Sequence, residues 1–341
     1  MRRKSPEQSH FAAETTAFLP ALLSAEASLR QRDFALADCQ AILRRGLHIG
    51  SAIVHHPFLP RAMAEARRQI AEAEERDEAT ASGFLITADR LSECQGRFRR
   101  PWHAPCGGLW GCLALANTLL PESRALLPLA VGVAAAETVR FFAPAAALRW
   151  VNDVLVGGRK LAGFLIESFL TPRYREEFDL VGLAFNLNNQ DFPAELRRHA
   201  TSLAAELGQT ISLPYFLALF LVKLRWNIGL LLHEEERLLA SEPRAEPQTE
   251  PQTEPPAQPL APAKHRILAA WLSLTDTLGK KLRYGFDVFN DPQYEATAIG
   301  IDECGGLILE HADGWRRTEY SGEVRYLDGH RSSTIFSSVS C

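Results

Sequence analysis

The chain has 341 residues, of which 46% are hydrophobic and 23% are charged, and its formal net charge is -4. This length allows two domains, because a single hydrophobic core stops growing at roughly 250 to 300 residues. The composition is that of a globular protein and not of a disordered one. The slightly acidic balance excludes a general attraction to nucleic acid phosphates.

Neither a membrane span nor a metal or disulfide framework is predicted. Residues 213–221 are the most apolar stretch, but Lys223 and Arg225 follow well before the roughly 18 residues that cross a bilayer, so we expect a buried helix. The six cysteines include no Cys-x-x-Cys pair, which is typical of free thiols in a reducing cytoplasm. Polar residues ahead of the first apolar run argue against a cleaved signal peptide. We therefore expect a cytoplasmic protein with no membrane contact.

The first 240 residues alternate helical and strand-like patterns. Residues 14–46 carry apolar side chains at loosely helical spacing. Further helices are predicted at 62–75, 127–142, 194–207 and 214–239, and strands at 84–86, 107–115 and 180–187. This order predicts an α+β fold, in which helices cover one face of a mostly antiparallel sheet.

The character of the chain changes at residues 241–264, which hold seven of the 20 prolines. Such a segment favours an extended, solvated conformation, and we interpret it as an insert. A helix is predicted at 267–278. Beyond it, short β-forming runs separated by Gly305-Gly306 and Asp313-Gly314 turns predict a small β-barrel.

The most informative segment, residues 149–167, places polar residues and a lysine inside an apolar stretch. Residues 154–156 and 161–166 are β-forming runs, and Gly157-Gly158 between them supplies the positive φ angles of a two-residue hairpin turn. Lys160 therefore lies just past the turn. Gly163 weakens the second strand unless something must approach the backbone closely there, and a bound ligand is one such thing.

This hairpin strongly resembles that of the biotin protein ligases, which carry Lys-Trp-Pro-Asn-Asp, a short turn and Lys-Leu-Ala-Gly-Ile-Leu. Trp150, Asn152, Asp153, Lys160, Leu161, Ala162, Gly163 and Leu165 match that pattern, whereas Arg149 replaces the first lysine and Val151 the proline. The β-rich tail, with its closing Gly-Glu-Val, resembles the SH3-like C-terminal domain of the same family.

A second match is the segment from Cys94 to Trp102, which resembles the family's Gly-Arg-Gly-Arg-Arg-Gly-Arg-x-Trp loop. Gly96, Arg97, Arg100 and Trp102 match, while four positions differ, among them Cys94, Phe98 and Arg99. Arginines suit such a loop because they can hold a carboxylate and a phosphate by paired hydrogen bonds. Having only one glycine, the loop is expected to be stiffer than its family counterparts. Residues 181–188 resemble the family strand Gly-Ile-Gly-Ile-Asn-Val-Asn, with Gly182 and Asn186 in place.

The resemblance implies a two-step, ATP-dependent ligase that makes a biotinyl-adenylate and passes biotin to a lysine of an acceptor domain. Arg97 and Lys160 are implied as the catalytic residues. Substrate-binding residues are implied at Gln95, Gly96, Arg100, Trp102, Gly163 and Gly182, with Trp102 as a packing support. Nucleotide-binding residues are implied at Arg149, Asn152, Asp153 and Asn186. Asp153 and Asn186 are also implied as Mg²⁺ ligands, because hard oxygen ligands suit that ion.

Two departures affect the identity of the acyl substrate. The family's Ser-Thr-Asn or Ser-Thr-Met appears here as Arg61-Ala62-Met63, and its glutamine before the arginine loop falls at Leu91. Two alternatives therefore stay open. One is a lipoate ligase or octanoyl transferase of the same fold with Cys94 as an acyl-thioester nucleophile. The other is a binding or regulatory protein that has lost turnover.

The expected domain organisation has three parts. Residues 1–50 form a helical extension, 51–280 the catalytic domain with the insert at 241–264, and 281–341 the SH3-like domain. No helix-turn-helix emerges from the extension, so no DNA partner is expected. The implied partner is a biotin carboxyl carrier domain, and association into a homodimer is a further expectation.

Overall fold

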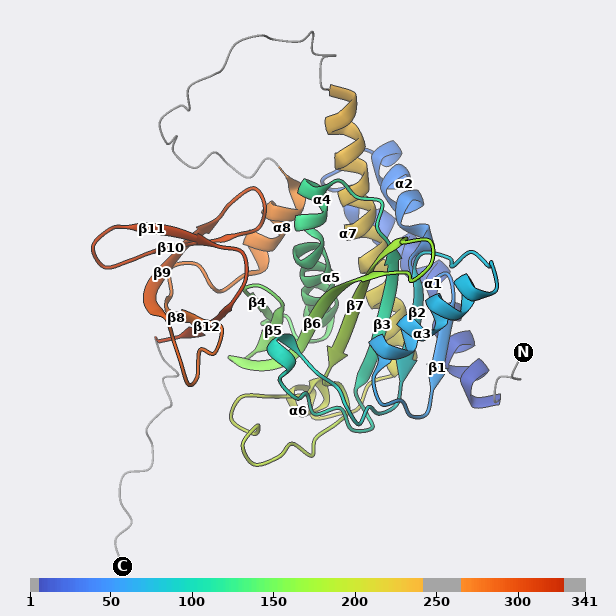
Figure 1. The fold of residues 1–341 in the computed structure, drawn as a ribbon, viewed down its shortest axis with the longest axis horizontal. Helices are drawn as coiled ribbons and strands as arrows, with labels where there is room; N and C mark the ends of the chain where they lie inside the picture. Colours follow the sequence, from blue (N-terminus) through green and yellow to red (C-terminus); the bar gives the residue numbers. More distant parts are fainter. Residues whose placement is uncertain (1–5, 242–264, 328–341) are drawn as a thin grey trace, which may run out of the picture.

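The computed structural model describes residues 6–241 and 265–327 and consists of two antiparallel-rich sheets with helices packed on the larger one (Figure 1). The larger sheet has the order β1-β2-β3-β7-β6-β5-β4. Only β1 and β2 pair in parallel. Its strands are β1 (Ile53–His56), β2 (Phe84–Ala88), β3 (Leu109–Ala116), β4 (Ala147–Arg149), β5 (Asp153–Val156), β6 (Arg159–Leu170) and β7 (Glu177–Phe185). The expected α+β class is confirmed.

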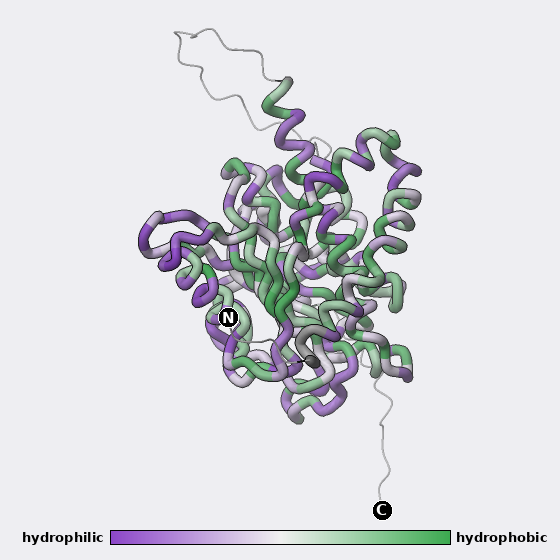
Figure 2. Tube along the Cα trace, turned by 90° about the vertical axis from the view of Figure 1, so that its right-hand side faces the viewer, coloured by the Kyte–Doolittle hydropathy of each residue, from purple (hydrophilic) through white to green (hydrophobic). Residues whose placement is uncertain are grey.

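Most helices form a layer on one face of this sheet. They are α1 (Pro6–Arg30), α2 (Leu36–Arg45), α4 (Pro121–Ala125), α5 (Leu127–Phe142), α7 (Leu213–Ser241) and α8 (Arg266–Leu274). Alternate residues of the strands, such as Leu113 and Leu183, join α5 and α7 in the main core. In Figure 2 the hydrophobic segments gather in the middle of the molecule. Helix α3 (Ala62–Glu75) covers the opposite face, against Cys112 and Leu180.

The long helix α7 includes Lys223 and Arg225, the two charged residues that end its apolar N-terminal stretch. The stretch Leu213–Ala240 is long and apolar enough to cross a membrane. However, 89% of its most apolar 18-residue segment is buried inside the protein. Lys223 pairs with Glu26 of α1 at 2.6 Å, and Arg225 donates from Nε to the carbonyl of Ile49. Because both charges have partners, α7 serves as the core helix that the sequence predicted.

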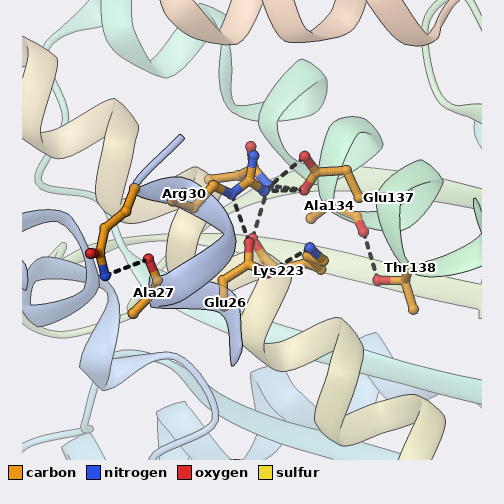
Figure 3. Close-up of polar contacts among 9 residues, drawn as sticks. Glu26, Ala27, Arg30, Ala134, Glu137, Thr138 and Lys223 are labelled. Atoms are coloured by element: carbon orange, nitrogen blue, oxygen red, sulfur yellow. Dashed lines mark hydrogen bonds and ion pairs between the residues drawn. The ribbon is translucent and has the colours of Figure 1, made fainter. Parts of the chain in front are cut away.

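The N-terminal helices pack onto this same core. Figure 3 shows the network that ties α1 to α5 and α7: Glu26 accepts from Lys223 and Arg30, and Arg30 also binds Glu137. The side chain of Glu26 is only 3% exposed. These paired charges fix α1 against the helical layer.

The second sheet has five strands in the order β11-β10-β9-β8-β12, all antiparallel. They are β8 (Lys281–Gly285), β9 (Tyr294–Ile301), β10 (Leu307–Glu310), β11 (Arg316–Glu319) and β12 (Glu323–Tyr326). Trp150 joins the two sheets, since its indole nitrogen donates to the carbonyl of Gly305 at 3.1 Å. This small sheet is consistent with the SH3-like domain expected at the end of the chain.

Two predicted helices are wrong in extent. The helix expected at 194–207 reduces to α6 (Leu203–Leu207), because Ala200 forms a β-bridge with Lys160 and draws the preceding residues into turns. The helix expected at 267–278 ends at Leu274, where the Thr275 hydroxyl and the Asp276 amide both bind the carbonyl of Leu148. The sequence analysis also missed β1, β4, β8 and β11 as strands. The insert predicted at 241–264 lies outside the described residues except for Ser241, and the three domain boundaries stay predictions.

Candidate active site

The hairpin of β5 and β6 carries Lys160 at a fixed place. Gly157 and Gly158 have φ angles of 57° and 75°, as the predicted two-residue turn requires. The backbone of Lys160 is held on its other side, because its N–H donates to His199 and its carbonyl accepts from Thr201. The lysine is therefore positioned by hydrogen bonds from two segments, while its side chain stays 31% exposed.

Lys160 belongs to a charged group centred on Asp153. The Nζ of Lys160 lies 2.7 Å from Oδ1 of Asp153, and Arg149 pairs with Oδ2. Burial raises the pKa of Asp153, but the attraction of Lys160 and Arg149 outweighs it and keeps the pKa below its usual range. Asp153 is thus a carboxylate that orients two cations. Asn152 donates its side-chain amide to the carbonyl of Phe164 and so ties the start of the hairpin to β6.

The two predicted glycines make room for side chains on the strands. A Cβ at Gly163 would lie 3.0 Å from Cε of Lys160 and 3.1 Å from the ring of Trp102. A Cβ at Gly182 would lie 2.9 Å from Sδ of Met63. The Nζ of Lys160 also sits 4.9 Å from the centre of the Trp102 ring, which is a cation–π distance. These glycines let Lys160, Trp102 and Met63 lie close to the sheet.

The arginine loop, from Cys94 to Trp102, is a tight loop whose two ends are hydrogen-bonded to each other. Trp102 donates its backbone N–H to the carbonyl of Cys94, and Gly96 donates to Arg100, both at 2.9 Å. Phe98 and Arg99 take φ angles of 55° and 57°. Side chains other than glycine rarely adopt this left-handed region, so the loop carries backbone strain where the related loops have a glycine at the position of Arg99.

The C-terminal sheet contacts this loop directly. Arg97 donates to the carbonyl of Gly322 at 2.7 Å. Arg100 lies 3.2 Å from the carboxylate of Asp287 and also pairs with Glu323. The ring of Phe98 meets that of Phe286 edge-on, with centroids 5.7 Å apart. The arginine loop and the small domain therefore lie against each other and together close one side of a cavity.

This cavity has a volume of about 360 Å³, and all twelve predicted site residues line it. They are Gln95, Gly96, Arg97, Arg100, Trp102, Arg149, Asn152, Asp153, Lys160, Gly163, Gly182 and Asn186. The sequence reading did not assign the lining residues that come from the second domain or from the turn region after β7, which include Val288, Phe289, Glu323 and His199. Burial lowers the pKa of Arg97, although Asp153 and Glu323 attract its charge. Arginine stays protonated even so, and the cavity is lined by Lys160 and five arginines, Arg61 and Arg325 among them.

The residues expected to bind Mg²⁺ are already engaged by other side chains. Both oxygens of Asp153 face cations, and the side-chain oxygen of Asn186 accepts a hydrogen bond from Asn189 at 2.9 Å. Within residues 6–241 and 265–327, no group of three His, Cys, Asp or Glu side chains could hold a metal. The metal role of Asp153 and Asn186 therefore stays a prediction.

Cys94 lines the cavity as a half-buried thiol. Burial raises its pKa to about 11, even though the nearby charge of Arg61 lowers it. A thiol with this pKa is almost fully protonated at neutral pH, and the thiolate is the nucleophilic form. Arg61, and not Lys160, is the cation that acts on Cys94.

Comparison with known proteins finds similarity to the same family for part of the chain. Residues 62–182 match the model of the biotin/lipoate A/B protein ligase family. The bifunctional ligase/repressor BirA of Bacillus spizizenii is 28% identical over 246 residues, and that of Escherichia coli is 24% identical over the same length. These alignments cover 71% of this chain, and the chain spans 66% of the length of either relative.

The fold is also that of a solved ligase. The structure of a biotin protein ligase from Aquifex aeolicus in complex with biotin and ATP superposes with a TM-score of 0.58 at 19% identity. It covers 80% of this chain and 97% of its own. At this identity the similarity establishes the fold. With the hairpin and the arginine loop, residues 62–182 thus resemble the biotin/lipoate A/B protein ligase family, whose model they match.

Proposed function

We propose that this protein is an ATP-dependent biotin protein ligase, which forms biotinyl-AMP and transfers biotin to a lysine of a biotin carboxyl carrier domain. The observation that carries the proposal is that Arg97 and Lys160, from two separate segments, line one cavity. Arg100 and Arg149 line it as well. The relatives named ligase/repressor and the Aquifex aeolicus structure with biotin and ATP support the same assignment.

In the first step, a carboxylate oxygen of biotin attacks the α-phosphorus of ATP. A carbon–oxygen–phosphorus anhydride forms, the bond to the β-phosphate breaks, and pyrophosphate leaves with the electron pair. Two anions must meet for this reaction, so fixed cations lower the barrier by stabilising the charge that gathers between them. Lys160 holds the reacting carboxyl oxygens, Arg97 bridges the carboxylate and the α-phosphate, and Arg100 binds the phosphates.

Asp153 positions the cations of the site. Its carboxylate fixes both Lys160 and Arg149, so the ammonium group is held in place before the substrates arrive. Such preorganisation avoids the cost of reorienting charge during the reaction. Magnesium, as a counter-ion of the nucleotide, would neutralise phosphate charge, and no step here depends on a protein-bound ion.

In the second step, the neutral amine of the acceptor lysine attacks the carbonyl carbon of the anhydride. An amide bond forms, the bond to AMP breaks, and the amine proton passes to solvent. This step needs no nucleophile from the ligase. The chemistry therefore agrees with a site rich in cations and without a reactive thiol.

The octanoyl transferase alternative requires Cys94 as a thiolate. A pKa of about 11 leaves roughly one part in a thousand ionised at pH 8. Incubation with an octanoyl donor is therefore expected to leave Cys94 unmodified by mass spectrometry. A stoichiometric octanoyl adduct on Cys94 would establish the transferase instead.

The proposal is tested by two assays on the full chain. Biotin should stimulate exchange of labelled pyrophosphate into ATP, and an added carrier domain should gain the mass of one biotinyl group when ATP is present. Binding of biotin with neither reaction would identify the non-catalytic alternative. Exchange stimulated by lipoate or octanoate, and not by biotin, would overturn the assignment of the acyl substrate.

A further inference from the structure

Phe98 stands between two cavity-lining arginines, and its own side chain packs on the second sheet. Arg97 and Arg100 line the cavity, whereas Phe98 does not. The Phe98 ring meets the ring of Phe286, just after β8, edge-on with centroids 5.7 Å apart. This arrangement is favourable because the positive edge of one ring meets the negative face of the other. The arginine loop therefore presents cations to the cavity and an aromatic ring to the second sheet.

The polar contacts between the arginine loop and the second sheet use the same donors as the substrates. Arg97 donates from Nη1 to the carbonyl of Gly322 at 2.7 Å. Arg100 pairs with Asp287 and Glu323. In the proposed reaction these two guanidinium groups bind the carboxylate and the phosphates, so their donors turn from the second sheet to the substrates. These polar contacts are therefore weakest when the substrates are bound.

The contact between Phe98 and Phe286 has a different character, because it uses no charge and no hydrogen-bond donor. An anionic substrate does not compete for it, and dissolved salt does not screen it. Phe98 is 42% exposed and Phe286 is 47% exposed, so neither ring belongs to the hydrophobic core. The pair therefore contributes little to the stability of the whole fold. What it does is join the arginine loop to the second sheet.

The backbone of the arginine loop depends on such a contact. Phe98 and Arg99 take φ angles of 55° and 57°. Residues other than glycine avoid this left-handed region, because their Cβ lies too close to a carbonyl oxygen. Such strain persists only where surrounding contacts hold the residue in place. The contact with Phe286 holds Phe98 from the second sheet, and the guanidinium carbon of Arg97 lies 5.1 Å from the centre of the Phe98 ring.

We propose that Phe98 is a positioning residue, which docks the arginine loop on Phe286 independently of the substrates. Its effect on the reaction rests on the proposed function. While the loop is docked, Arg97 and Arg100 already lie at the cavity, so no binding energy is spent on closing the loop. A protein whose loop is docked for only part of the time binds its ligand with an affinity reduced by that fraction.

Loss of the docking contact should therefore act on binding and not on the chemical step. The KM for ATP should rise, because part of the binding energy is then spent on ordering the loop. The value of kcat should stay within about twofold, since bound anions themselves hold Arg97 and Arg100. A purely structural role for Phe98 would lower the amount of folded enzyme and leave KM unchanged.

Docking of the loop is measured first by trypsin cleavage of the full chain, which needs no activity. Trypsin cuts after arginine, so an undocked loop is cut after Arg97 and Arg99, and mass spectrometry identifies the fragments. The main variant is Phe286→Ala, because it leaves the sequence of the loop unchanged. Cleavage after Arg99 should become about 3- to 10-fold faster, the ratio that corresponds to one aromatic pair. Phe98→Tyr keeps the ring and should stay within about twofold of wild type.

A double-variant cycle shows whether the two rings act together. Phe98→Ala and Phe286→Ala should each raise the KM for ATP in pyrophosphate exchange by about 3- to 10-fold, and the double variant should be no worse than either one. The matched control is Trp315→Ala. Trp315 is an exposed aromatic residue of the same domain whose ring packs on His311, so neither loop cleavage nor KM should change.

Thermal unfolding of each variant shows that it is folded. Equal loop cleavage in the wild-type protein and in folded Phe286→Ala overturns this inference. A double variant whose change in KM is the product of the two single changes overturns it as well, because the rings would then act separately. A wild-type protein without biotin-dependent exchange overturns the proposed function instead, and the cleavage rates still decide whether Phe286 docks the loop.

Discussion

Two groups of ion pairs use the same residue types and differ in balance and exposure. In the helical layer, Glu26 and Glu137 face Arg30 and Lys223, so two negative charges meet two positive ones. Around the cavity, Arg97, Arg100, Arg149 and Lys160 outnumber the carboxylates they contact, which are Asp153, Asp287 and Glu323. Among the described residues, Arg97 hydrogen-bonds a carbonyl and a hydroxyl and pairs with no carboxylate. The first group is neutral and buried, whereas the second keeps an excess of positive charge at a cavity.

This difference separates what each group contributes. A buried pair is strongly destabilising when one partner is removed, because the other charge is left without compensation. The positive charges at the cavity are only partly neutralised by carboxylates of the protein. An anionic substrate can neutralise the rest when it binds. We therefore expect substitutions in the helical network to lower stability and those at the cavity to lower activity.

The largest effect is expected for Glu26→Gln. Lys223 would then be a buried ammonium group without a carboxylate, and the free energy of unfolding should fall by about 3–5 kcal/mol. Denaturant unfolding measures this change. The double variant Glu26→Leu with Lys223→Leu is expected to recover most of the loss, because an apolar pair of similar size needs no charge compensation. Equal stability of Glu26→Gln and wild type would show that the network does not anchor α1.

The opposite behaviour is expected for Lys160→Ala. Adenylate formation should fall by about 100- to 1,000-fold, the range found when one charge-stabilising donor is removed. Stability should change by less than about 1 kcal/mol, since Lys160 is partly exposed and Asp153 keeps Arg149.

Its matched control is Arg159→Ala in the same turn. Arg159 pairs with Glu206 and does not line the cavity, so biotin-dependent pyrophosphate exchange should stay within about twofold of wild type. Near-normal exchange in Lys160→Ala would remove this lysine from the reaction.

Local sequence signals predicted the hairpin because they depend on neighbouring residues. Gly157-Gly158 defines the turn, and the β-forming runs on either side define the two strands. The same holds for α3 and α5, whose predicted bounds agree with the structure. The predicted site residues also belong to such local motifs, because the family resemblance that named them was read from the hairpin and the arginine loop. These residues line the cavity.

Contacts between distant segments could not be read from the sequence. Arg61 meets Glu167 across 106 positions, and Arg100 meets Asp287 across 187. The shortened helix at α6 has the same cause, since residues near Ala200 pair with Lys160 in preference to forming a helix. Tertiary pairing thus overrides a local helical pattern and supplies the site residues that no local pattern marks.

The smallest effect is expected where the arginine loop meets the second sheet. Asp287 and Glu323 both pair with Arg100, which the proposed reaction needs at the phosphates. In Asp287→Ala one competing carboxylate is lost, so the KM for ATP should fall by no more than about fivefold, and the difference should shrink as salt rises. Glu295→Gln is the matched control, because Glu295 is an exposed acid of the same sheet that pairs with Arg283. A higher KM in Asp287→Ala, with Glu295→Gln unchanged, would mean that Asp287 positions Arg100 for the nucleotide. Asp287 would then belong with Asp153, among the acids that hold cations ready.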